Sequence, residues 1–506
     1  MSTARFILVA LICASPVILV ADGLIIQGLV ALIVASALVI IAQSLRPGEA
    51  GFLVSLILAP AAIAAVPALL VLIQLLPLRV LAHPIWTSAE QALGYAVAGA
   101  ISVDVGQSVI AFGKYLSMAA VALLSAAVAV DRLSAKWLLF ALTGAGATIG
   151  LGMLAQDVFF PGVVFGAFTR AQAINCTAMG AIFASAALIR AIERYETRPS
   201  SLQRSAPTLL RTSAASAAAL VICVAALISS GTYWTIFASG CGLAALACVL
   251  VIRRFARGPW SSAAMGASAL GVTLLILAYH PPEDGRSLPV AFAPASSASL
   301  MALSERVLAD APVVGTGAGT FAAVAPIYRE MDDPPPGPVA PTTAAAVAVE
   351  LGKPMLFMIV VATAAAIFIL LRASLRRGRD SFYSAMAGSC LITLLLLAFT
   401  NAGLLGIATS LIAAVVLGLG LAQSKSRTPQ SYPFLSHTAI LSLPTLDPPE
   451  SGNPRMWAVL DYIYYMSYSV RLTAPRHRSG FSRQCLSPSK GDRTPAQLAE
   501  QFDAPY

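Results

Sequence analysis

Apolar runs of about twenty residues follow one another along the first 422 positions, and shorter polar stretches separate them. A helix of about 20 residues crosses the hydrocarbon core of a bilayer, which is about 30 Å thick. Many runs are rich in Ala and Gly, which lets helices approach closely in a bundle. We therefore predict an all-α polytopic membrane bundle with about twelve transmembrane helices, at roughly 6–21, 25–44, 52–77, 108–130, 137–155, 171–190, 213–231, 234–251, 261–279, 355–371, 384–400 and 402–422.

The composition of the chain excludes a soluble domain. Hydrophobic residues make up 58% of it and charged residues 11%, and its mean hydropathy is +0.81. A soluble domain carries about 25% charged residues, because these cover its surface. The net charge of +9 comes from basic residues spread between apolar runs. We therefore expect the chain to contact the lipid bilayer and no nucleic acid.

The basic residues predict an orientation. With the predicted spans, one side of the membrane holds most of them: Arg5, Arg46, Arg132, Lys136, the run from Arg190 to Arg211, Arg253, Arg254, Arg257, Arg372, Arg376, Arg377, Arg379, Lys425 and Arg427. The other side holds fewer: Arg79, Arg170, Arg286, Arg306, Arg329 and Lys353. Because Lys and Arg accumulate in cytoplasmic loops, both termini are predicted to be cytoplasmic in a bacterial inner (plasma) membrane.

Three segments outside the spans stand out. The first non-cytoplasmic loop, 78–107, contains a stretch, 89–100, that we expect to lie as a short helix on the membrane surface. The loop 280–354 is the largest on that side, and loops of this length usually carry function. The membrane domain is therefore predicted to cover 1–422, followed by a cytoplasmic, mostly disordered tail, 423–506, rich in Ser, Pro and Arg.

Motifs for metals and nucleotides are missing from the sequence. The seven cysteines are scattered without a CxxC pair, and neither HExxH nor a phosphate-binding loop occurs. We therefore expect no metal and no cofactor.

The informative stretch of the large outside loop runs from Leu303 to Arg329. It begins as a short amphipathic helix that ends near Asp310, because Pro312 and the following glycines favour an irregular turn. Further on, Glu350 lies in a Glu-Leu-Gly sequence that leads into the next span.

This arrangement resembles the family of O-antigen ligases and O-antigen or exopolysaccharide polymerases. Its members have an Arg-bearing helix and then a Pro-x-x-Gly-x-Gly-x-Gly-x-Phe segment in a large periplasmic loop between late spans. The matching residues here are Pro312, Gly315, Gly317, Gly319 and Phe321, and spans and loop together cover roughly 1–422. The resemblance implies a metal-independent glycosyltransferase that faces the periplasm. It would move a glycan from a polyprenyl-diphosphate carrier to lipid A core or to a growing polysaccharide.

One departure from the family concerns catalysis. Members often carry a His-Asn pair about nine residues before the Glu-x-Gly, and its histidine is proposed to act as general base. Pro341 and Thr342 stand there in this chain, and a proline cannot accept a proton. If catalysis persists, Glu305 or Glu350 is the candidate base.

Arginines are the candidates for holding the diphosphate. A guanidinium fork binds phosphate oxygens bidentately and keeps its charge. On the non-cytoplasmic side these are Arg170, Arg306 and Arg329. Simpler roles stay open: Arg170 as a helix-end anchor, Arg306 paired on a solvated helix face, and Arg329 in a surface charge cluster. Lys114, near the outer end of its span, either snorkels or reaches a lipid phosphate.

Two other functions remain open. A transporter or flippase for a lipid-linked or small substrate would need polar residues within the spans and broken helices. A family member that assists polysaccharide assembly without catalysis would account for the missing His-Asn pair. The sequence does not choose between ligation and polymerisation, and it does not identify the sugar or the acceptor.

Overall fold

The computed structural model of the 506-residue chain describes residues 2–44, 47–78, 82–159, 166–196, 206–230, 233–255, 288–290, 292–293, 298–329, 339–376 and 381–425. The chain divides into two units, Met1–Arg427 and Thr428–Tyr506. The second unit lies outside the described residues, so the predicted disorder and cytoplasmic position of the tail stay predictions.

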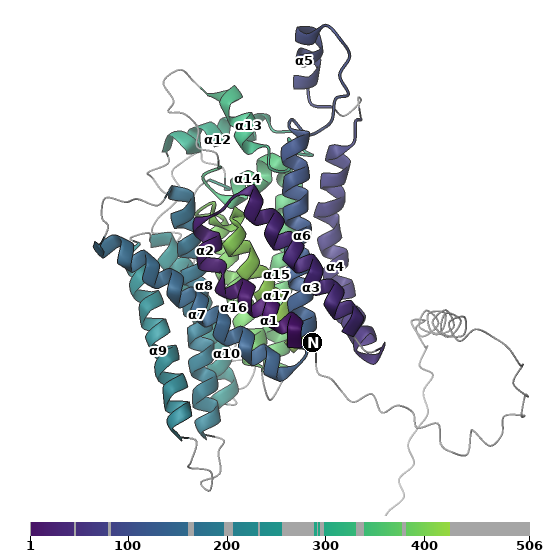
Figure 1. Ribbon diagram of the computed structural model, residues 1–506. Helices are drawn as coiled ribbons and strands as arrows, with labels where there is room; N and C mark the ends of the chain where they lie inside the picture. Colours follow the sequence, from purple (N-terminus) through teal and green to yellow (C-terminus); the bar gives the residue numbers. More distant parts are fainter. Residues whose placement is uncertain are drawn as a thin grey trace, which may run out of the picture. The chain divides into compact units, whose positions relative to one another are not determined.

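Every regular element in the described ranges is a helix (Figure 1). The long ones are α3 (Leu24–Ser44), α4 (Pro47–Leu75), α6 (Val105–Ala129), α7 (Arg132–Phe159), α8 (Ala167–Glu196), α9 (Ala206–Ser229), α10 (Tyr233–Phe255) and α15 (Lys353–Arg376). The shorter ones are α1 (Ser2–Cys13), α2 (Ser15–Val20), α5 (Ile85–Leu93), α12 (Ala298–Asp310), α13 (Phe321–Val324), η4 (Ala325–Tyr328), α14 (Thr343–Glu350), α16 (Phe382–Ala398), η5 (Gly403–Leu405) and α17 (Ile407–Ser424).

In the part of the chain that the structure describes, nine helices are long and apolar enough to cross a membrane. They are α3, α4, α6, α7, α8, α9, α10, α15 and α17, and each coincides with a predicted span. The predicted span 261–279 lies outside the described residues. The prediction of a polytopic helical membrane protein is therefore confirmed, while the total of twelve stays a prediction.

One predicted crossing is interrupted, and another begins later than predicted. The span expected at 6–21 consists of α1 and α2, which are separated at Ala14, and Pro16 lies in the first turn of α2. Proline is tolerated there because the first turn of a helix has no partner for its N–H groups. The span expected at 402–422 begins late. After α16 the chain leaves the helix, passes through η5, and starts α17 at Ile407.

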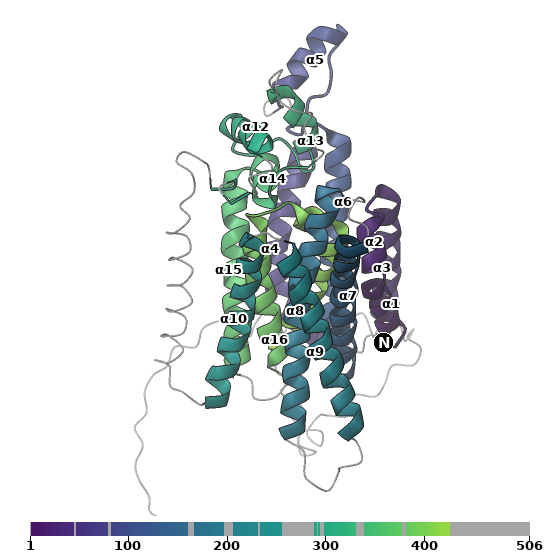
Figure 2. The same cartoon turned by 90° about the vertical axis from the view of Figure 1, so that its left-hand side faces the viewer.

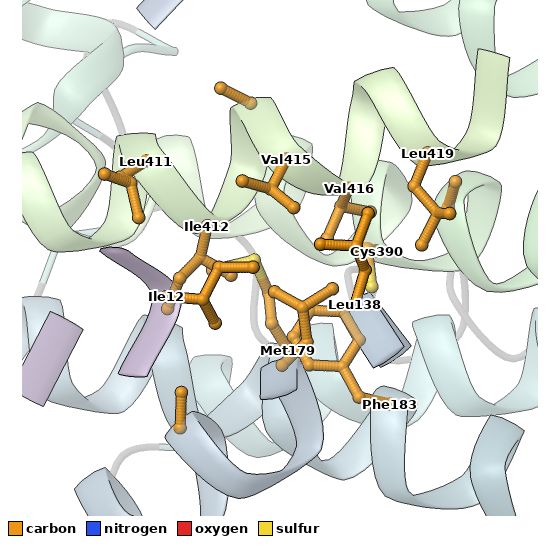
Figure 3. Close-up of a cluster of buried hydrophobic side chains, with 14 of the residues drawn as sticks. Ile12, Leu138, Met179, Phe183, Cys390, Leu411, Ile412, Val415, Val416 and Leu419 are labelled. Carbon is orange, nitrogen blue, oxygen red and sulfur yellow. The ribbon is translucent and has the colours of Figure 1, made fainter. Parts of the chain in front are cut away.

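The core of the first unit is built around α8. Of its most apolar window, 83% is buried, against 22% for α3 and 6% for α15, so α8 is a central helix. Side chains from α1, α7, α8, α16 and α17 meet in one cluster (Figure 3), which includes Ile12, Leu138, Met179, Phe183, Cys390 and Ile412.

The short helices α12, α13 and α14 lie together at one end of the bundle, which we call the outer end, and α5 projects beyond the same end (Figures 1 and 2). A second, smaller core lies there beneath the glycine-rich segment, with Leu303, Val307, Phe321, Val324 and Val349 buried in it. The segment 280–354 therefore contains folded pieces in its described parts. The predicted helix end near Asp310 is confirmed by α12.

The surface helix expected at 89–100 is placed differently. The structure has α5 at Ile85–Leu93, followed by the left-handed residue Gly94, whose N–H donates to the Glu90 carbonyl at 2.9 Å. Glycine adopts this conformation at helix ends without a steric penalty, and it terminates the helix. The residues after Gly94 are not helical as far as Asp104, which caps α6.

Candidate active site

The glycine-rich motif folds back against the end of α14. The Thr316 N–H donates to the Val349 carbonyl at 3.0 Å, and the Gly317 N–H donates to the Glu350 carbonyl at 3.1 Å. Gly315 has a φ of +78°, and a Cβ atom there would overlap the Glu350 carbonyl. The motif is therefore glycine-rich because two backbones lie against each other at this point.

Gly352, the glycine of the Glu-Leu-Gly sequence, packs closely against the backbone of the glycine-rich segment. Its φ is +90°, and a Cβ atom there would overlap the Val313 carbonyl. The two sequence features that carried the family resemblance are thus parts of one structure. The sequence placed them about thirty residues apart without predicting this contact.

The Glu350 carboxylate is held by the motif. The Gly319 N–H donates to Oε2 at 2.8 Å, and the Phe321 N–H donates to Oε1 at 3.3 Å. Burial raises the pKa of Glu350 to about 7, although both N–H groups and the charge of Lys114 oppose that shift. A carboxyl group with a pKa near 7 exchanges a proton readily at physiological pH.

The ammonium group of Lys114, on α6, interacts electrostatically with the Glu350 carboxylate. Its Nζ donates to the Leu405 carbonyl, in the interruption between α16 and α17. The ammonium lies near enough to Asp22 and Glu350 for their charges to interact. Asp22 in turn accepts a hydrogen bond from the Gln172 amide of α8 at 2.8 Å. We call Asp22, Lys114 and Glu350 the charged centre.

Gln74 was not identified from the sequence. It is fully buried at the outer end of α4, and its Nε2 donates to the Val314 carbonyl at 2.7 Å and to the Glu350 carbonyl at 2.9 Å. A single amide in an otherwise apolar run was the signal, because buried amides in membrane helices are retained where they bind a neighbour. Gln74 ties the outer end of the bundle to both segments of the site.

Pro341 and Thr342 directly precede α14, at the positions where members of the family that the sequence resembles have His-Asn. The Thr342 hydroxyl accepts from the Ala345 N–H at 3.0 Å and donates to the Pro289 carbonyl at 2.6 Å. This is an N-cap, a role that threonine fills well. The position supports the helix that carries Glu350 and contributes no base.

The remaining predicted site residues lie on other elements. Arg170, near the start of α8, forms an ion pair with Asp157 of α7 at 3.7 Å, and both side chains are substantially exposed. Glu305 and Arg306 lie partly buried on α12, and Arg329 is exposed at the end of η4. Their roles in base catalysis and diphosphate binding stay predictions. Of the two candidate bases, Glu350 is the one held by the motif.

Among the described residues, no group of three His, Cys, Asp or Glu side chains gathers to hold a metal ion. The expectation of a metal-free and cofactor-free site stays a prediction.

Comparison with known proteins adds no relative: no family model matches this chain, and no curated protein matches it. The fold and the charged centre define a polytopic helical membrane protein with a polar site at one end of its bundle.

Proposed function

We propose that this protein transfers a glycan from a polyprenyl-diphosphate carrier to lipid A core or to a growing polysaccharide, at the outer face of a bacterial inner membrane. The observation that carries the proposal is the Glu350 carboxylate. The glycine motif holds it by two N–H groups, its pKa is about 7, and it lies near the Lys114 ammonium. A proton acceptor beside a cation is what this transfer needs.

The chemistry assigns one task to each group. The acceptor hydroxyl gives its proton to Glu350 while its oxygen forms a bond to the anomeric carbon of the donor. The bond between that carbon and the diphosphate oxygen breaks, and its electron pair stays on the diphosphate. Lys114 stabilises the charge that develops on this leaving group. The products are the glycosylated acceptor, polyprenyl diphosphate and a proton on Glu350.

The proposed orientation places the charged centre outside the cytoplasm. Among the described residues, the end opposite the outer end holds more of the basic side chains: Arg5, Arg132, Lys136, Arg190, Arg211, Arg253, Arg372, Arg376 and Lys425. The outer end holds fewer: Arg170, Arg306, Arg329 and Lys353. This distribution favours cytoplasmic termini and an outward-facing site.

The test begins with the gene. Deleting it should alter lipopolysaccharide or exopolysaccharide on a gel, and unchanged patterns would contradict the proposal. The variant Glu350→Gln keeps the size of the side chain and removes the proton acceptor, so it should fail to complement while still inserting into the membrane. The variants Arg170→Ala and Arg306→Ala test the predicted diphosphate contacts in the same assay.

A transporter or flippase for a lipid-linked substrate is the second candidate. The interrupted crossing α1–α2 favours it, as do the polar groups Gln172 and Asn175, which lie beside the irregular turn that joins α16 to α17. Transporters build their sites from such breaks. Substrate uptake into vesicles, unchanged by Glu350→Gln, would favour transport over transfer.

A role in polysaccharide assembly without catalysis is the third candidate, supported by Pro341 in place of the family's histidine. A transfer assay with purified protein and a lipid-linked glycan distinguishes this assembly role from the glycan transferase. Transfer that depends on Glu350 supports the enzyme, and a deletion phenotype that Glu350→Gln rescues supports the assembly role.

A further inference from the structure

A cavity of about 230 Å³ lies between α3 and α6, in the half of the bundle nearer to the outer end. Most of its wall is apolar, and Ile407, the first residue of α17, closes it on one side. Among the described lining residues, Lys114 is the one that carries a charge. The cavity therefore combines a hydrocarbon-like wall with a cation.

Two glycines keep this space open. Gly28 of α3 and Gly113 of α6 line the cavity, and a Cβ atom at either position would meet nothing within 4 Å. A larger side chain at either position would therefore begin in open space at the cavity wall. Glycine inside a helix lowers helix stability by roughly 1 kcal/mol relative to alanine. The absence of a side chain at these two positions therefore leaves the cavity open but destabilises both helices.

Lys114 has donors left for a ligand. An ammonium group has three N–H donors, and the described hydrogen bond to the Leu405 carbonyl uses one of them. The charges of Asp22, in the chain after α2, and of Glu350, at the end of α14, also act on Lys114. Two N–H donors therefore remain for the oxygen atoms of an anionic ligand.

We propose that this cavity holds the first isoprene units of the polyprenyl carrier, with the phosphate next to them on Lys114. The inference rests on the proposed function and adds where the donor lies. The apolar wall between two membrane-spanning helices suits a hydrocarbon chain that arrives from the bilayer. The ammonium at that wall matches an anionic head, and it places the reacting end of the donor towards Glu350.

Photolabelling of the full-length protein in nanodiscs tests the proposal, with a diazirine-bearing farnesyl diphosphate as the probe. Labelled peptides should come from α3 and α6. Gly28→Leu and Gly113→Leu should each lower labelling about tenfold, which corresponds to about 1.4 kcal/mol of binding free energy. Gly144→Leu on α7 is the matched control, because a Cβ atom there also meets nothing within 4 Å and Gly144 lies outside the cavity.

The charge is tested in the same way. Lys114→Gln should lower labelling about tenfold through the lost charge-assisted bond. Lys136→Gln, at the start of α7 beside the Phe140 ring, removes a lysine elsewhere and should leave labelling unchanged. Equal labelling of Lys114→Gln and wild type would overturn the assignment of the phosphate.

Further outcomes separate this site from the function. Labelling that maps to other helices, or that persists in both leucine variants, would overturn the site while leaving glycan transfer possible. Equal labelling by a diazirine-bearing phosphatidylglycerol would also overturn it, because the cavity would then hold bulk lipid. Specific labelling together with unchanged polysaccharides in the deletion strain would support the site and contradict the transfer reaction.

Discussion

Asn175 of α8 and Asn401, in the break between α16 and α17, donate to each other through their side-chain amides, at 3.0 Å in both directions. The backbone carbonyl of Asn401 also accepts from the N–H and the hydroxyl of Thr343, each at 3.0 Å. Thr343 begins α14, whose last residue is Glu350. The amide pair therefore joins the central helix of the bundle, through the break, to the helix that carries the carboxylate.

We predict that Asn175 and Asn401 are energetically coupled. Asn401→Ala leaves the Asn175 amide buried without its partner, which should destabilise the protein by about 1 kcal/mol. The double variant should lose less stability than the sum of the single variants, because the second removal has no bond left to break. Thermal unfolding of the purified protein in detergent measures this. Strictly additive losses would show that the pair does not stabilise the break.

The pKa of Glu350 predicts two opposite responses to pH. The fold raises this pKa from 4.5 to about 7, so the folded protein binds the proton more tightly than the unfolded chain does. The stability from this group is therefore full below pH 4.5 and is lost as the pH rises to about 7. The rate of glycan transfer should rise as the pH approaches 7, because a general base must be ionised to accept a proton. Glu350→Gln should remove this contribution to the pH dependence of stability and abolish glycan transfer. A rate that falls as the pH rises through 7 would indicate an acid instead.

The glycine motif predicts a difference between two similar substitutions. Gly94→Ala strains only the backbone, since its φ is +72° and a Cβ there meets nothing within 4 Å; we expect a loss of about 1 kcal/mol. Gly315→Ala adds an overlap with the Glu350 carbonyl to a similar strain. It should cost more stability and also reduce transfer, because the backbones that position Glu350 must separate. Equal effects of the two variants on thermal unfolding and on activity would contradict the packing of the motif.

Much of the fold was predictable because hydropathy alone determines which segments enter a bilayer. The helix end near Asp310 and the glycine turn followed from Pro312 and from backbone preferences that act locally. The interruption at Ala14 was not predictable in this way. Proline is tolerated in membrane helices, so the pattern between Phe6 and Ala21 did not distinguish one helix from two.

The charged centre could not be predicted from local sequence preferences. Lys114 was identified as a lysine inside a span, but its hydrogen bond to the Leu405 carbonyl and its charge interactions with Asp22 and Glu350 join segments far apart in the chain. An apolar span shows little preference for one face, so its sequence does not reveal which neighbour its polar residue meets. For the same reason Gln74, which bonds a carbonyl 276 residues away, was missed.

Gln74 gives the prediction that best separates structural support from function. Gln74→Met keeps the length of the side chain but leaves the Val314 and Glu350 carbonyls without their donor, so we expect a loss of about 2 kcal/mol of stability. Gln423→Met is the matched control, because this amide is also buried and donates to the carbonyl of Ala129, at the other end of the bundle. Both variants should unfold at lower temperature. Only Gln74→Met should also lower the rate of transfer below the temperature at which either variant unfolds, because Gln74 positions the residue that accepts the proton. Equal rates in the two variants would mean that Gln74 stabilises the fold and does not position Glu350.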